Sequence, residues 1–164
     1  MTYGLVVSNS SVLIHLTKIS RLDLLYKLFK RVVIPLAVYR ECTVDGKPGS
    51  ESIKKASWIN VLSIKNTALK QSLMYFLDEG ESEVIVLALE INADLVLLDE
   101  SEARRIAKNF GLNVTGTIGI LLKAKKKGYI ENLSKELNKL KASGFWIDNK
   151  LIEKILKETK ESYN

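Results

Sequence analysis

Four oxygen-bearing side chains stand at positions where a sheet protein could assemble a reactive site. Asp99 directly follows an apolar run, and Asn9 follows another. Glu41 lies on the helix predicted after a third such run, and Glu83 in the first turn of the helix that leads into the Asp99 run. Apolar runs of this kind indicate strands buried on both faces, as in parallel sheets. Because parallel strands end at one edge of their sheet, the four side chains are predicted to meet there.

Three carboxylates at one edge would repel one another and raise each other's pKa unless a cation neutralised them. Mg²⁺ and Mn²⁺ prefer oxygen ligands and retain several waters, which suits such a set. One or two of these ions could activate a water and stabilise charge on a phosphate. The residue types therefore indicate metal-dependent phosphodiester hydrolysis.

Basic residues follow the acidic ones closely in the sequence. Arg104 and Arg105 lie on the predicted helix after Asp99, and the next predicted helix ends in Lys123, Lys125, Lys126 and Lys127. These side chains are candidates for holding a nucleic-acid backbone. A lysine run at a helix end is also commonly solvated, and it suits the helix dipole.

Strands and helices alternate along almost the whole chain, which predicts a mostly parallel sheet with helices on both faces. Predicted strands cover 3–7, 32–34, 58–62, 95–98 and 112–114, and predicted helices include 22–29, 50–56, 65–77, 81–90, 101–109 and 117–127. Two amphipathic helices, over 131–142 and 149–161, finish the chain. We expect residues 1–164 to form one domain, with the helices of about 131–164 covering the same core.

The composition bounds the class of protein. The 164 residues are 46% hydrophobic and 27% charged, as in ordinary globular proteins, and no stretch approaches a membrane span. A single cysteine, Cys42, suits the reducing cytoplasm, and one cysteine with one histidine excludes a Cys/His zinc site. The net charge of +6 favours an anionic partner, although a lysine-rich composition also accompanies life at high temperature.

Several stretches resemble a subfamily of PIN-domain nucleases, in the right order from about Leu5 to Phe145. They are Val6–Leu16 with Ile19–Leu25, Gly80–Ala88, Leu97–Asp99 and Val114–Leu122. The resemblance implies a three-layer α/β/α sandwich and a Mg²⁺- or Mn²⁺-dependent ribonuclease. Some PIN proteins are toxins paired with an antitoxin, and many dimerise, so RNA, an antitoxin and a second copy are implied partners.

The family's acidic positions carry over by resemblance onto Asn9, Glu41, Glu83 and Asp99. Asn9 departs from the general pattern, because most active PIN nucleases have an aspartate there. An amide oxygen can ligate a metal but supplies no charge. Glu102, one turn beyond Asp99, is a candidate for a substitute charge. Hydroxyl groups at Ser10, Thr115 and Thr117 are secondary candidates for contacting metal-bound water or phosphate.

Each of these residues also has a structural interpretation. Asn9 and Asp99 are good helix N-caps, and an acid in a first helical turn, as predicted for Glu83, is favoured by the dipole. His15 lies among apolar helix positions, where a structural role is the more common one. Trp58, Phe145 and Trp146 are expected to pack into the core instead of stacking on bases.

Two functions remain open on this basis. The first is a metal-dependent ribonuclease. The second is a weak or inactive PIN-like module that binds nucleic acid or protein, which Asn9 favours. A phosphoacceptor domain of the receiver type is less consistent with the sequence, since it would need an acidic pair after the first strand, where Ser8-Asn9-Ser10-Ser11 offers none.

Overall fold

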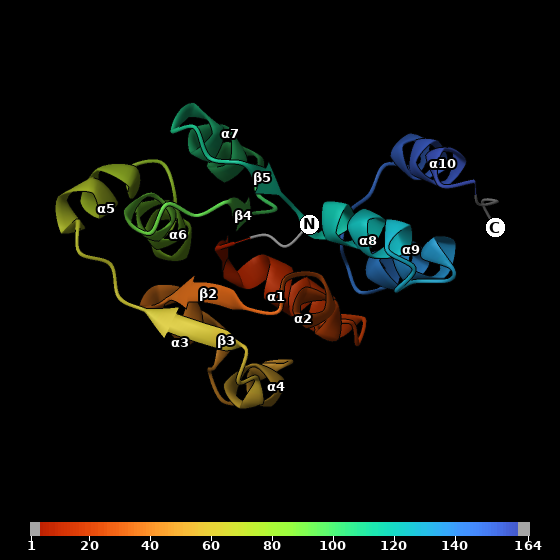
Figure 1. Cartoon of the computed structure of the whole chain (residues 1–164), viewed down its shortest axis with the longest axis horizontal. Coiled ribbons are helices and arrows are strands. Elements are labelled where there is room, and N and C mark those ends of the chain that lie inside the picture. The colour runs from red at the N-terminus through yellow and green to blue at the C-terminus, as the bar shows by residue number, and fades with distance from the viewer. Residues whose placement is uncertain (1–3, 161–164) are drawn as a thin grey trace.

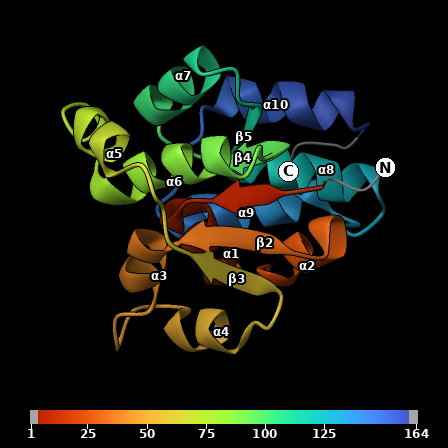
Figure 2. The same ribbon diagram turned by 60° about the vertical axis from the view of Figure 1, so that its left-hand side comes forward.

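A five-stranded, all-parallel sheet organises the computed structural model, which describes residues 4–160. The strand order is β3-β2-β1-β4-β5, and Figure 2 shows this order from β5 down to β3. The strands are β1 (Val6–Ser8), β2 (Val32–Pro35), β3 (Ile59–Leu62), β4 (Leu95–Leu97) and β5 (Val114–Thr115). The predicted parallel α/β class is confirmed, although Tyr3, expected in the first strand, lies outside the described residues.

Helices flank this sheet, and the structure is consistent with a three-layer sandwich. Figure 1 shows α5 and α6 on one side of the strands and α1, α2, α8 and α9 on the other. The helices are α1 (Ser10–Lys18), α2 (Asp23–Phe29), α3 (Leu36–Cys42), α4 (Ser50–Lys55), α5 (Thr67–Leu73), α6 (Glu79–Glu90), α7 (Ser101–Asn109), α8 (Thr117–Lys126), α9 (Leu133–Ala142) and α10 (Asn149–Glu158).

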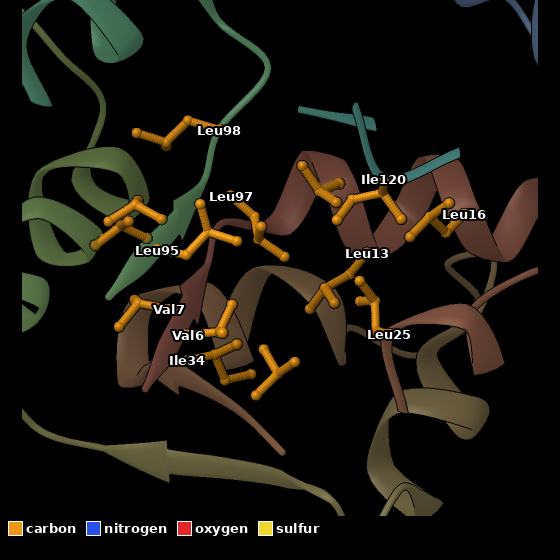
Figure 3. Packing of buried hydrophobic residues seen from close by; sticks show 14 of the residues in the cluster. Val6, Val7, Leu13, Leu16, Leu25, Ile34, Leu95, Leu97, Leu98 and Ile120 are labelled. Carbon is orange, nitrogen blue, oxygen red and sulfur yellow. The ribbon is translucent and has the colours of Figure 1, made fainter. Parts of the chain in front are cut away.

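The core is aliphatic, because the central strands carry apolar side chains toward both helical layers. Val7, Ile34, Leu97 and Ile120 are essentially inaccessible to solvent, and Figure 3 shows how such side chains pack between β1, β4 and helix α1. The same hydrophobic cluster includes residues from α9 and α10, among them Leu137 and Ile152. Burial of this apolar area supplies the main favourable term in folding.

The register of β1 and β4 sets the geometry of the site. Val6, Val7 and Ser8 of β1 lie opposite Leu95, Val96 and Leu97 of β4. The residues that follow both strands therefore emerge side by side at the carboxyl edge of the sheet. None of the helices within residues 4–160 has the length and apolar character needed to span a lipid bilayer.

Candidate active site

Asn9 forms the junction between β1 and α1, and it is 2% exposed. Its side-chain oxygen accepts a hydrogen bond from the Val12 backbone N–H at 3.1 Å, which confirms the predicted N-cap. Its own backbone N–H donates to the Leu97 carbonyl at 3.0 Å. Asn9 is thus fixed against the end of β4, two residues before Asp99.

Asp99 is held by three hydrogen bonds from two helices. One carboxylate oxygen accepts from the Thr117 backbone N–H at 2.8 Å, and the other from the Thr117 hydroxyl at 2.6 Å and from His15 Nδ1 at 2.9 Å. Burial by itself would raise the pKa of Asp99, but the bonds from His15 and Thr117 outweigh it and lower that pKa. Because Asp99 is ionised, His15 Nδ1 acts as the donor.

A glycine gives this carboxylate its room. A Cβ atom at Gly116 would lie 2.6 Å from Asp99 Oδ1 and 3.2 Å from the Leu98 carbonyl oxygen. The backbone oxygen cannot move aside as a flexible side chain could. Any side chain at Gly116 would therefore disturb the end of β4, where Asp99 sits.

Glu41 lies on α3 and points toward α1 and α6. Its Oε2 atom accepts a hydrogen bond from the Ser10 hydroxyl at 2.6 Å, next to Asn9 in the chain. Its other oxygen packs over Gly80, where a Cβ atom would approach it to 2.4 Å. Burial raises the pKa of Glu41 above its usual value, partly offset by the bond from Ser10.

Glu83 lies on α6, is 6% exposed, and faces α3 and α5. The helix α6 begins at Glu79 and not at residue 81, so Glu83 is beyond its first turn and the predicted dipole interaction with α6 is wrong. Glu83 instead accepts a hydrogen bond from the Ala37 backbone N–H, in the first turn of α3, at 3.1 Å. Its second oxygen forms an ion pair of 2.6 Å with Lys70 Nζ.

The four predicted residues all lie at the carboxyl edge of the sheet, where α1 contacts Glu41 through Ser10 and Asp99 through His15. Glu41 and Glu83 flank the contact between α3 and α6, while Asp99 is bound to α1 and α8. In residues 4–160, no three or more acidic, histidine or cysteine side chains are arranged as ligands for one metal ion. Each of the four predicted side chains accepts a hydrogen bond from the protein in this structure, so their convergence on one metal ion stays a prediction.

The donor chemistry nevertheless suits a hard cation. Every candidate ligand is a carboxylate or amide oxygen, which Mg²⁺ and Mn²⁺ prefer. A cationic group already sits at one of them, since Lys70 Nζ lies 2.6 Å from Glu83 and 3.4 Å from Glu79. The hydrogen bond to Glu83 raises the pKa of Lys70. The buried carboxylate of Glu83 is thus balanced by a positive charge, and in this structure Lys70 supplies that charge.

A hollow of about 300 Å³ opens beside Asp99. Arg104, Thr115, Gly116 and Phe145 contribute to its lining. Arg104 is oriented by donating to the Leu98 carbonyl at 3.0 Å. This hollow joins one ionised carboxylate to one guanidinium, the kind of group that binds phosphate oxygens well.

The other basic candidates lie elsewhere. Arg105 forms an exposed ion pair with Glu102, so the charge of Glu102 is already matched by a protein group. The lysines at 123, 125 and 126 stand in the last turn of α8, and Lys127 follows it as its C-cap. The ten residues of α8 span about 15 Å, so its C-terminal lysines lie far from its N-terminus, where Arg104 of α7 approaches Gly116 beside Asp99.

Three smaller features complete the description of these residues. Glu100, not Asp99, occupies the N-cap position of α7, so the capping role expected for Asp99 is wrong. Ser10 and Thr117 donate to carboxylates in this structure. Cys42 is buried, and burial raises the pKa of its thiol to about 12, so it stays protonated and is a poor nucleophile at neutral pH.

Sequence reasoning missed two residues of the site, His15 and Lys70. His15 is 84 positions from Asp99 in the chain, and nothing in its helical surroundings indicates that pairing. Lys70 lies on the predicted helix before Glu83, but only the packing of α5 on α6 brings the two together. The edge of the Phe145 ring meets His15 at 4.7 Å between ring centroids, so Phe145 also belongs to the surroundings of Asp99.

The lowered pKa of Asp99 predicts a pH-dependent contribution to stability. Its carboxylate stabilises the fold above the ordinary pKa of 3.8, and this contribution is lost as the pH falls through the lower folded value. Asp99→Asn should therefore lower the free energy of unfolding by about 1.5–3 kcal/mol at pH 7. Urea unfolding of both proteins from pH 7 to pH 3 should show this difference shrinking in acid. A difference that stays constant with pH would contradict the assignment, and Glu102→Gln is the exposed control.

Comparison with known families agrees with this geometry. The sequence model of a PIN-domain family matches residues 5–161. No curated protein matches the chain. PIN domains are a nuclease-type family whose members generally bind nucleic acid and use divalent metal ions. The match covers nearly the whole chain, and the parallel sheet with flanking helices is the fold expected of it. The chain therefore belongs to the PIN-domain family.

Proposed function

We propose that this protein is a divalent-cation-dependent ribonuclease that hydrolyses phosphodiester bonds in the cytoplasm. One observation carries the proposal. Asp99 is ionised beside a hollow that also contains Arg104, and the carboxylates of Glu41 and Glu83 lie at the same edge of the sheet. Negative oxygens next to a phosphate-binding guanidinium are the groups that phosphodiester hydrolysis by a cation-loaded site requires.

The side chains have distinct roles in this proposal. Asp99 supplies a fixed negative charge, and His15 with Thr117 orients it. Arg104 binds the phosphate through its guanidinium. When bound, Mg²⁺ or Mn²⁺ would be held by Asn9, Glu41, Glu83 and Asp99, and would supply positive charge against the phosphate and promote ionisation of water.

The test is cleavage of structured and single-stranded RNA with Mn²⁺, with Mg²⁺ and with EDTA. The wild type should cut with either metal and stop in EDTA, and Glu83→Gln should cut far more slowly. Glu102→Gln is the matched control, because it removes an exposed glutamate of the same size that pairs with Arg105. Cleavage that ignores EDTA and Glu83→Gln would overturn the proposal.

A second candidate is a module that binds RNA or protein without cutting. It is favoured by one observation, that Asn9, Glu41, Glu83 and Asp99 each already accept hydrogen bonds from protein groups. This candidate predicts RNA binding with no cleavage in any metal. The same set of incubations, read by both gel shift and product formation, separates the two.

The proposal extends to partners through the family resemblance. We infer a toxin whose ribonuclease activity a cognate antitoxin blocks, and a homodimer as the assembled form. A neighbouring reading frame whose product binds the protein and stops RNA cleavage would support the toxin assignment. Light scattering of the purified protein reports the oligomeric state.

Asn9→Asp tests the unusual residue of the set. Aspartate caps helices about as well as asparagine, so α1 should persist. A carboxylate at this buried position lacks a partner of opposite charge, however, and should destabilise the protein by about 1–3 kcal/mol in EDTA. Mn²⁺ should raise the melting temperature of this variant more than that of the wild type, and speed cleavage. Equal shifts in both proteins would show that Asn9 is not a metal ligand.

A further inference from the structure

Trp146 is 83% exposed, against the expectation that it packs into the core. The residues on either side of it explain this. Ile147 is buried at 4% exposure, and the ring of Phe145 contacts His15. Trp146 therefore faces solvent between two neighbours whose side chains contact the body of the protein.

The segment that carries Trp146 is well anchored. The Phe145 backbone N–H donates to the Leu140 carbonyl at 3.2 Å, which ties the segment to the end of α9. Asp148 caps α10 by accepting from the Lys150 backbone N–H at 3.0 Å. The indole is therefore presented to solvent from a backbone that is held on both sides.

Trp146 borders a hollow of about 480 Å³ that adjoins the active-site hollow. Phe145 lines both hollows, and the active-site hollow also contains Asp99 and Arg104. Lys141 and Asp148 both line the Trp146 hollow; the Lys141 ammonium donates to Asn149 Oδ1 at 2.7 Å, and the Asp148 carboxylate is engaged by the Lys150 backbone N–H. Phe145 is therefore the residue that links the exposed indole and Lys141 to the hollow of the proposed catalytic carboxylate.

We propose that Trp146 is a stacking platform for an unpaired base of single-stranded RNA whose backbone crosses the Asp99 hollow. Every base has a flat π-face, so stacking on an indole is sequence-tolerant but requires that the base be unpaired. Lys141 attracts the adjoining phosphate. This inference rests on the proposed function and adds to it a base-stacking subsite at Trp146.

The experiment measures binding in EDTA, so that no cleavage is needed. The chain has two tryptophans, Trp58 and Trp146, and Trp58 stacks loosely near Tyr26, away from this segment. A single-stranded oligoribonucleotide should quench the fluorescence of the wild type and of Trp58→Phe. It should leave Trp146→Phe unquenched. Absence of quenching in the wild type would overturn the proposal.

Affinity measurements complete the test. Trp146→Ala should bind the oligoribonucleotide about tenfold more weakly, and Trp146→Phe only a few-fold more weakly. An abasic strand of equal length should bind the wild type and Trp146→Ala alike. Equal affinity of both proteins for the normal strand would overturn the subsite, and so would an equal loss on the abasic strand. A weakened dimer with unchanged RNA affinity would assign the indole to a protein interface instead.

The outcome is separable from that of the ribonuclease proposal. Quenching through Trp146 without cleavage in Mn²⁺ supports the stacking subsite and removes the enzyme. Cleavage in Mn²⁺ with no contribution from Trp146 to affinity keeps the enzyme and removes the subsite.

Discussion

Asp99→Asn is expected to lower the rate of Mn²⁺-dependent RNA cleavage by about 100-fold, equivalent to about 2.7 kcal/mol in the activation free energy. The substitution removes the one carboxylate that is both ionised and next to the Arg104 hollow. It also places an amide N–H₂ against His15 or Thr117, which already donate to that position. Initial rates on labelled RNA at saturating Mn²⁺ give the measurement.

Two further variants show whether the effect belongs to the carboxylate. His15→Asn and Thr117→Val leave Asp99 in place but loosen it, and each should cost about tenfold in rate, as residues that orient a ligand commonly do. Circular dichroism checks that all three variants fold. If Asp99→Asn cut RNA as fast as the wild type, Asp99 would have no part in catalysis.

Lys70→Met is expected to destabilise the protein by about 2 kcal/mol. Glu83 is almost fully buried, and its ion pair with Lys70 compensates its charge. Removing one partner of such a pair leaves an uncompensated buried carboxylate, which costs roughly 3–5 kcal/mol when both are fully enclosed. Lys70 keeps 20% of its side chain exposed, so part of that penalty is relieved by water.

A double-mutant cycle isolates the pair. Glu83→Gln combined with Lys70→Met should recover most of the lost stability, because no bare carboxylate remains. Lys54→Met is the matched control, since Lys54 pairs with Asp45 and Glu51 at the surface and its loss should leave the free energy of unfolding nearly unchanged. Mn²⁺ should stabilise Lys70→Met more than the wild type, because it can replace the missing cation. Additive single effects in urea unfolding would contradict a direct Lys70–Glu83 coupling.

Local patterns in the sequence were sufficient for the elements of the fold. Continuous apolar runs such as Leu95–Leu98 identify buried parallel strands, because no alternation of polar residues is needed when both faces are covered. The helix at 101–109 matches its predicted bounds, and the helix that contains Glu83 starts at Glu79, two residues earlier than predicted, because Asp78 and Glu81 form a capping box. Helix ends depend on such caps, which short-range periodicity does not reveal.

The position of the site could be predicted from the sequence, but the hydrogen-bond donors to its carboxylates could not. That Asn9 and Asp99 meet at one edge follows from parallel topology. Which donors reach the carboxylates depends on how α1, α5 and α8 pack, and those contacts join residues up to 84 positions apart. Trp146 was predicted to be buried from its aromatic character alone, but it is exposed, because local sequence does not show which way a loop side chain faces.

The most direct test of the account is a crystal of the wild type soaked in Mn²⁺ and examined by anomalous diffraction. We expect a manganese peak at the carboxyl edge of the sheet, in contact with oxygens of Glu83 and Asp99, with Lys70 moved away from Glu83. The same soak of Asp99→Asn should lose or weaken the peak. A map of the wild type with no manganese at this edge, at concentrations that support RNA cleavage, would contradict the account.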